Sequence, residues 1–478
     1  MKDNIALIII LFFILSFPIF AQDCSCLEDF DHLIAKTEAN YIGYYIKVTA
    51  QNKPDYEKFT ATHRQKAKVS SNEDCVFVLR EWLDYFKDYH LFIVENPKFN
   101  EAEKQQFLAN ASSLSISEKE VKTYLQKNSK KLNSIEGLWY SKSEKYAVIA
   151  DPNNKKRFIA VVLETQTQNW KSGQIRAEFW QESDGTYKTV YFMDDHSKRN
   201  VKSSIYKNIL LNVGIYGWGK IFPLSKNAEN FLDSSDPQKT TLKIIDGKNI
   251  LISIPTFNDP NYRQVLEDLL KANHERILAS ENLIIDLRGN SGGSRFDDLL
   301  APYILTGEFR VNEPNFALAS KDNLQYFKYL SRLSAGLGKR LAPVLERMEA
   351  NPNKIVPYFE ERFDKPETIY PTPKNVAILI DRAVGSASEG FLLDAIQSRR
   401  VKLFGENTRG NIDYQQTTAI PLKCEKRGLI LGYPMYTRTR NLPNEAIDYI
   451  GIPPNVRIPK GVMDWVQFVV DYYAKKKS

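Results

Sequence analysis

The chain has 478 residues, 43% of them hydrophobic and 26% charged, a globular composition for which two or three domains are expected. Its net charge of +7 is modest for this length, and its lysines are scattered apart from a short terminal run. Because a nucleic-acid-binding surface needs clustered basic residues, the composition gives no support for a nucleic-acid partner.

The first 21 residues predict a secretory signal. An almost wholly apolar run, residues 5–20, is shorter than a membrane span of about 20 residues, and polar sequence follows at once. We expect cleavage after Ala21, with an uncleaved anchor as the alternative, and no later run is long enough to span a bilayer. The mature chain is therefore expected to be exported, to the periplasm or the extracellular space.

The 4 cysteines, Cys24, Cys26, Cys75 and Cys424, fit an exported protein. An even number permits two disulfides, in any of three connectivities. No second Cys-x-Cys or histidine pair stands at ligand spacing, so no metal site is predicted. A bond from Cys24 or Cys26 to Cys75 would fasten the mature N-terminus to the segment before His90.

Residues 22–134 are predicted to form a mostly helical region that carries His90. Apolar residues recur at helical spacing, most clearly between Cys75 and Phe86. Asp88-Tyr89-His90 then stands at a corner before a strand that begins at Leu91. A lone histidine at such a corner usually has a surface or packing role.

Residues 135–240 are predicted to form a small antiparallel β domain. Strand-like segments at 146–150, 157–163, 174–180 and 187–192 are separated by turn residues at 151–154 and 183–185.

From residue 241 to 478, strands alternate with helices, which indicates an α/β domain. Strands are expected at 250–254, 283–287, 376–380, 401–404, 418–422 and 429–433, and helices at 262–279 and 463–473. Pro421 would suit an edge position or the end of a strand.

A glycine-rich turn follows the strand at 283–287 and contains Gly292 and Gly293. Glycine permits positive φ and close backbone approach, so this turn can direct N–H groups at a developing oxyanion. An ordinary strand-to-helix turn is the alternative.

Ser386 occupies a second strand-to-helix turn, between the apolar run 376–380 and a helix at 391–396. Free N–H groups at a helix start point outward, so this position suits a nucleophile of acyl transfer. The alternative is that Ser386 is a helix N-cap, and Ser388 and Glu389 have the same competing interpretation.

Together, these stretches resemble the C-terminal-processing (tail-specific) and tricorn-core serine peptidases. The family motif Asp-Leu-Arg-x-Asn-x-Gly-Gly matches residues 286–293, Ser-Ala-Ser-Glu matches 386–389, Gly-Glu/Thr-x-Thr-x-Gly matches 405–410, and the late Glu-x-x-Gly-Ile/Val-x-Pro-Asp matches 448–455. The resemblance implies a crotonase-like fold, in which sheets and helices stack, for the α/β domain.

A serine hydroxyl needs a base to become a nucleophile. In the lysine-dependent branch of the family, the base lies in a Thr-Phe-Gly-Lys-Gly run, but Asn411 occupies the lysine position here and cannot be a base. The nearby Lys402, Lys423 and Lys426 do not match that motif.

The tricorn-like branch instead uses a histidine from an Asp-x-His corner and a late acidic residue. Asp88-Tyr89-His90 matches the corner, although Gly or Ser is more frequent at the Tyr89 position. Asp448 matches the acid, shortened from the usual Glu, and Glu445 is an alternative. The resemblance therefore implies His90 as base and Asp448 as the residue that orients it, which is the logic of a catalytic triad.

The sequence thus predicts a secreted serine endopeptidase that forms an acyl-enzyme on a polypeptide substrate. Ser386 attacks, His90 shuttles the proton, and the N–H groups of Ala387 and of Gly292 or Gly293 hold the oxyanion. No metal, nucleotide or other cofactor is implied, and no oligomeric state is predicted. One alternative is an inactive peptidase-like domain that binds peptide or glycan; another is acyl-CoA chemistry on a crotonase-like core, against which export argues.

Overall fold

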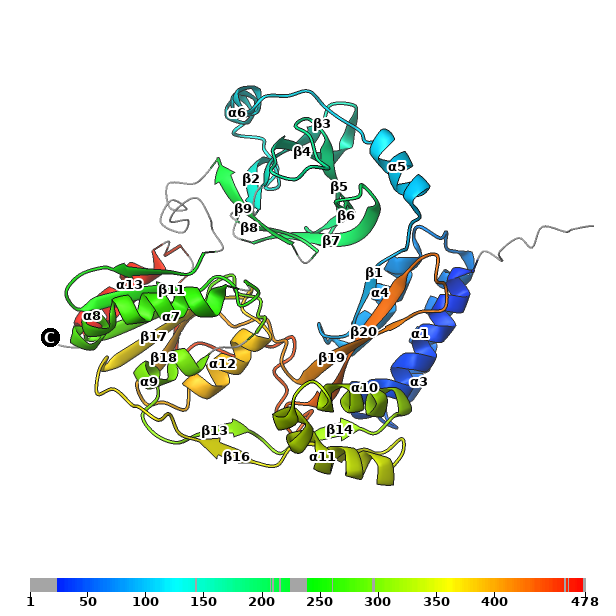
Figure 1. Cartoon of the computed structure of the whole chain (residues 1–478). Coiled ribbons are helices and arrows are strands. Elements are labelled where there is room, and N and C mark those ends of the chain that lie inside the picture. The colour runs from blue at the N-terminus through cyan, green and yellow to red at the C-terminus, as the bar shows by residue number, and fades with distance from the viewer. Residues whose placement is uncertain are drawn as a thin grey trace, which may run out of the picture.

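The computed structural model describes residues 24–475 except 142–143, 207, 209, 215, 224–238, 260, 295–296, 460 and 463. The predicted signal segment, residues 1–21, lies outside the described residues. Figure 1 shows a barrel, a sheet with helices around it, and a second sheet that joins N-terminal and C-terminal segments. No helix in the described part of the chain combines the length and the apolar character that crossing a membrane requires.

A six-stranded sheet forms the centre of the α/β part, and the predicted α/β class is confirmed. Its order is β10–β11–β12–β17–β18–β21, with only β10 antiparallel to its neighbour. The strands are β10 (Thr241–Ile244), β11 (Asn249–Ser253), β12 (Asn282–Asp286), β17 (Asn375–Ile380), β18 (Val401–Gly405) and β21 (Val456–Arg457).

Both faces of this sheet are buried, which explains why its strands are continuous apolar runs in the sequence. Ile285 and Ile378 belong to the core on one face, and Ile284 and Leu379 to the core on the other. The first face is covered by α7 (Tyr262–Ala272), α8 (His274–Ala279), α9 (Ala301–Ile304) and α12 (Ala387–Ala395), and the second by α13 (Trp465–Lys475). The short helix η2 (Asp297–Leu299) precedes α9.

The second sheet brings residues from the N-terminal region into contact with the C-terminal half. β1 (Phe92–Glu95) pairs antiparallel with β20 (Leu429–Thr437), with Phe92 opposite Gly432. The other strands are β14 (Phe316–Leu318), β15 (Ile355–Pro357) and β19 (Tyr414–Pro421), which ends at the predicted Pro421.

Helices from both halves of the chain share one hydrophobic core with this sheet. In Figure 1 the blue helix α1 lies beside the orange strand β20, and α3 packs against α1. The helices are α1 (Cys26–Asn40), α2 (Ile42–Lys47), α3 (Lys53–Val69), α4 (Cys75–Leu83), η1 (Asp84–Phe86), α10 (Lys321–Ser331) and α11 (Ala335–Ala350). A separate hairpin pairs β13 (Phe309–Asn312) with β16 (Arg362–Asp364).

The antiparallel β domain is a closed eight-stranded barrel, which leaves no free edge between the strands. The strands are β2 (Gly137–Ser141), β3 (Glu144–Asp151), β4 (Asn154–Glu164), β5 (Ile175–Gln181), β6 (Tyr187–Phe192), β7 (Lys198–Tyr206), β8 (Leu210–Val213) and β9 (Tyr216–Phe222). Trp139, Tyr146 and Trp218 are among the fully buried side chains of its core. The connector that precedes the barrel contains α5 (Glu101–Ala109) and α6 (Glu118–Lys127).

One disulfide joins Cys26, at the start of α1, to Cys75, at the start of α4. The predicted bond between Cys75 and a cysteine of the N-terminal pair is therefore confirmed, with Cys26 as the partner. Cys24 and Cys424 are thiols in this structure, and hydrogen bonding to Cys424 is the main cause that raises the pKa of the Cys24 thiol to about 11.

We expect non-reducing peptide mapping to recover Cys26 bonded to Cys75. The bond closes a loop with a sequence separation of 49, and the chain-entropy model assigns roughly 4 kcal/mol to a loop of about that length. The double substitution Cys26→Ser with Cys75→Ser should therefore lower the free energy of unfolding of the N-terminal helices, measured by hydrogen exchange. Cys24→Ser is the control, and free thiols at both Cys26 and Cys75 in the exported protein would contradict the pairing.

Candidate active site

Ser386 lies at the turn between β17 and α12 with an unusual backbone conformation. Its φ is +55° and its ψ is −121°, a region that non-glycine residues seldom adopt. Strain of this kind persists only where the surroundings impose it, and it is frequent at active sites. The turn presents the Ser386 hydroxyl to His90, whose Nε2 atom lies 3.0 Å from the Ser386 Oγ atom.

His90 approaches Ser386 from the N-terminal region, immediately before β1. Its backbone N–H donates to Asp88 Oδ1 at 2.8 Å, and its Nδ1 atom lies 2.8 Å from the carbonyl oxygen of Tyr414. Because a carbonyl oxygen can only accept, this contact assigns the ring proton to Nδ1. The Nε2 atom is then the acceptor for the Ser386 hydroxyl, which is the arrangement that a general base requires.

No hydrogen bond joins Asp448 to His90 in the described part of the chain, so this geometry gives no support to the expectation that Asp448 orients the histidine ring. Its Oδ1 atom accepts the backbone N–H groups of Ile412 and Asp413, and its enclosed Oδ2 atom has no hydrogen-bond partner among the described residues. Its carboxylate thus holds the loop before β19, while the Tyr414 carbonyl occupies the Nδ1 position. Glu445, the alternative acid, is exposed and accepts from Asn441.

Burial, followed by the nearby Asp88 and Asp413, raises the pKa of Asp448 to about 8. Asp88 and Asp413 each have partners of their own. Asp413 pairs with Arg438 at 3.0 Å and accepts the N–H of Asp448 at 2.8 Å. Asp88 Oδ2 accepts the hydroxyl of the buried Tyr41 at 2.8 Å. This environment favours the protonated form of the Asp448 carboxyl group.

The glycine turn lies directly against the Ser386 turn. Gly292 has φ +106°, and a Cβ atom there would come within 2.8 Å of the Gly385 oxygen and the Ser386 Cβ, and 3.0 Å of the Ala387 nitrogen. Gly293 has φ +135°, and its Cβ would lie 2.4 Å from the carbonyl carbon of Phe257. Both positions therefore require glycine. The Gly292 N–H donates to Asn290 Oδ1 at 3.0 Å, which fixes the shape of the turn.

Glu389, which sequence reasoning treated mainly as a capping residue, joins the Ser386 turn to the 408–411 loop. Its buried carboxylate accepts the backbone N–H groups of Ser386 at 3.1 Å, Gly410 at 2.8 Å and Asn411 at 2.7 Å. Burial raises its pKa, against the hydrogen bonds that favour the charged form. Asn411 thereby lies beside the nucleophile's turn, although its side chain has no basic group.

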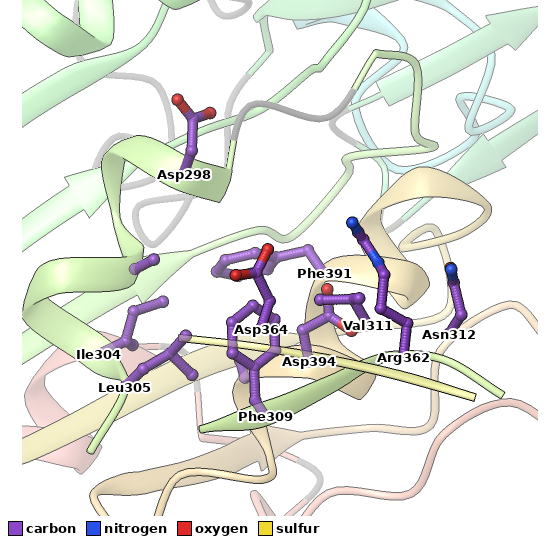
Figure 2. Close-up of a pocket in the computed structure, with 12 residues that line it drawn as sticks. Asp298, Ile304, Leu305, Phe309, Val311, Asn312, Arg362, Asp364, Phe391 and Asp394 are labelled. Carbon is purple, nitrogen blue, oxygen red and sulfur yellow. The ribbon is translucent and has the colours of Figure 1, made fainter. Parts of the chain in front are cut away.

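A cavity of about 290 Å³ opens along α12, beyond the Ser386 turn. Figure 2 shows its apolar side chains, which include Phe309 and Phe391, near the carboxylates of Asp364 and Asp394. None of the six predicted site residues lines this cavity. In the described part of the chain, no group of three or more His, Cys, Asp or Glu side chains has the geometry of a metal site.

Residues 249–458 match the model of peptidase family S41. This match confirms the resemblance to the tail-specific and tricorn-core peptidases and indicates a serine-type peptidase. A search of curated protein sequences found no match.

Solved structures of peptidases resemble the chain at low sequence identity. Mature CPAF is 14% identical with a TM-score of 0.48, and the match covers 95% of this chain and 96% of that one. The photosystem II D1 C-terminal processing protease is 13% identical with a TM-score of 0.39, over 92% of this chain and 95% of that one. The tricorn protease is 12% identical with a TM-score of 0.40, over 95% of this chain and 37% of that one.

We expect Asp448→Asn to retain most of its turnover at pH 7, because the amide replaces a carboxyl group whose neutral form is already favoured. The raised pKa also sets the sign of a stability effect. The folded protein binds this proton more tightly than the unfolded chain, so stability is lost as pH rises from about 4, the ordinary carboxyl value, to about 8. Asn does not titrate, so the variant lacks this loss. The unfolding free energy of Asp448→Asn minus that of wild type, measured by denaturant titration, should therefore grow between pH 5 and pH 9. A more than hundredfold loss of turnover in the folded variant would restore Asp448 as the orienting acid.

We expect Gly292→Ala and Gly293→Ala each to lower turnover, because the added methyl group displaces the backbone beside Ser386. Loss of one oxyanion donor typically costs about 10²–10³ in turnover. Gly247→Ala is the matched control, since a Cβ atom there would meet nothing within 4 Å. Near-normal turnover in both site variants, with the fold intact, would mean that the glycines only turn the chain.

Proposed function

We propose that the protein is an exported serine endopeptidase in which Ser386 is the nucleophile and His90 the general base. The observation that carries this proposal is the 3.0 Å contact between His90 Nε2 and Ser386 Oγ, made across 296 residues of sequence. The apolar N-terminal segment and the disulfide support export. The substrate is a polypeptide, as the peptidase family implies.

In the proposed reaction, the Ser386 hydroxyl gives its proton to His90 Nε2 as its oxygen attacks the peptide carbonyl carbon. The resulting oxyanion is held by the N–H of Ala387 at the start of α12 and by the Gly292-Gly293 turn. The Tyr414 carbonyl oxygen accepts a hydrogen bond from the His90 Nδ1–H group throughout, so the imidazolium that forms keeps its orientation. His90 then protonates the leaving amine, and water hydrolyses the acyl-enzyme with His90 again as base.

This assignment favours a histidine base, as in the tricorn-like branch, over a lysine base. Asn411 stands at the lysine position and offers no basic group. Of the nearby lysines, Lys423 is exposed and lies 3.4 Å from Glu28, on the surface of α1. An imidazole already within hydrogen-bonding distance of the hydroxyl is the base that this geometry favours.

Ser386→Ala and His90→Ala should each abolish turnover of a quenched-fluorescent polypeptide, and the double variant should be little worse than either. Residues that act as one unit are non-additive in this way. A fluorophosphonate probe should label wild-type Ser386 and fail to label Ser386→Ala. Lys402→Ala and Lys423→Ala are matched controls and should keep their activity.

Two results would overturn the assignment. If His90→Ala retains activity while a lysine variant loses it, a relocated lysine is the base. If folded wild-type protein is neither labelled nor active, the chain is a peptidase-like binding protein.

A further inference from the structure

Three side chains from separate segments form a stack beside the nucleophile. The Arg409 guanidinium lies 4.3 Å from the centroid of the Tyr89 ring. The Tyr89 and Tyr449 rings are stacked at 4.4 Å with an interplanar angle of 9°. Because Tyr449 covers one face of Tyr89, Arg409 must lie on the other face. We call these residues the Arg409 stack.

The Arg409 stack adjoins both proposed catalytic side chains. Tyr89 immediately precedes His90 in the chain. The Arg409 backbone N–H donates to the Val384 carbonyl at 2.7 Å, and its side-chain carbons lie 3.3 and 3.4 Å from the position of a Cβ atom on Gly385. A Cβ atom on Gly292 would meet the same turn at the Gly385 carbonyl oxygen and Ser386 Cβ, so Arg409 and the glycine turn both lie close to the Ser386 turn.

The Arg409 guanidinium has no carboxylate partner within the described part of the chain, although it is only partly exposed. The acids of the neighbourhood have other roles. Asp88 accepts from His90 and Tyr41, and Asp448 accepts from the backbone of Ile412 and Asp413. A guanidinium that stacks on an aromatic ring can still donate hydrogen bonds from the N–H groups at its edge. Two of these N–H groups match the two oxygens of a carboxylate.

The position of His90 indicates which part of a substrate passes this guanidinium. The base that takes the nucleophile's proton later gives it to the leaving amine, so the leaving segment of the peptide lies on the His90 side. Tyr89, which holds Arg409, is the chain neighbour of His90. The segment C-terminal to the cleaved bond is therefore the part of the substrate that Arg409 can reach.

We propose that Arg409, supported by Tyr89 and Tyr449, is a specificity-determining residue that binds a carboxylate in the leaving segment of the substrate. The proposal rests on the proposed function, because it takes Ser386 and His90 as the reacting pair. The carboxylate has two possible sources, an acidic side chain just after the cleaved bond or the C-terminal carboxylate of a short tail. Both sources present a carboxylate to the Arg409 guanidinium.

The test compares kcat/KM for quenched-fluorescent peptides that differ in one group. One pair has Glu or Gln at the first three positions after the cleaved bond; a second pair has a free C-terminal carboxylate or a carboxamide two to four residues after it. A hydrogen bond to a charged group contributes about 1.5–3 kcal/mol, so wild-type protein should prefer the charged member of one pair by roughly 10- to 150-fold. The preference should appear mainly in KM.

Arg409→Gln should reduce that preference to near unity, and Tyr449→Leu, which removes the support of Tyr89, should reduce it in part. Arg332→Gln, at an exposed position on the end of α10, is the matched control and should leave it unchanged. A preference for Glu identifies a side chain as the source, and a preference for the free acid identifies the C-terminus. No preference in wild-type protein, or one unchanged in Arg409→Gln, overturns the inference.

Fluorophosphonate labelling of the same preparations separates the two proposals. Labelled wild-type protein without a carboxylate preference contradicts only the role of Arg409. Wild-type protein that is folded but not labelled contradicts the proposed function itself.

Discussion

The structure depends on one short strand pairing, that of β1 with β20. His90 and Ser386 are 296 residues apart in sequence, and closing so long a loop is entropically costly. The pairing of Phe92–Glu95 with Leu429–Gly432 fixes His90 beside the strand that also leads to Tyr414. The contact between His90 and Ser386 is intact only while both halves of the chain are in register.

Several polar contacts reinforce that junction from outside the sheet. Arg80 donates to the Ile93 carbonyl at 3.0 Å and to the Asn200 carbonyl of β7 at 2.8 Å, so it joins β1 to the barrel. Buried Asp29 on α1 accepts from Arg427 at 2.9 Å and from the Cys424 N–H at 2.8 Å, at the tip of the β19–β20 hairpin. A buried charge such as Asp29 is stable only with partners like these. The barrel and the N-terminal helices therefore both support the β1–β20 junction, next to which His90 lies.

Local sequence signals predicted the parts of the site that depend on residue type. The apolar runs of β12 and β17 and the glycines at 292–293 indicated both turns, because buried parallel strands and positive φ restrict composition strongly. The carbonyl of Tyr414 gave no such signal, since every residue has one. Closure of the barrel depends on pairing between distant strands and was also not predictable. The helix expected over 262–279 is interrupted at Asn273, whose side chain donates to the Leu269 carbonyl and competes with the helical pattern.

The use of a carbonyl in place of a carboxylate changes how the histidine is controlled. A carboxylate that orients a catalytic histidine also stabilises the imidazolium, and its replacement by an amide can reverse the tautomer and cost about 10⁴ in turnover. The Tyr414 carbonyl can only accept, so no side-chain substitution at that position changes the tautomer directly. Asp88 contacts the His90 backbone N–H, whereas burial and the nearby Asp88 and Asp413 raise the pKa of Asp448 and favour its neutral form. In the proposed mechanism, a backbone oxygen therefore takes the ring-orienting position that a carboxylate has in a Ser-His-Asp triad. The proposed catalytic side chains are then Ser386 and His90 alone, and their relative position depends on the strand register that positions Tyr414.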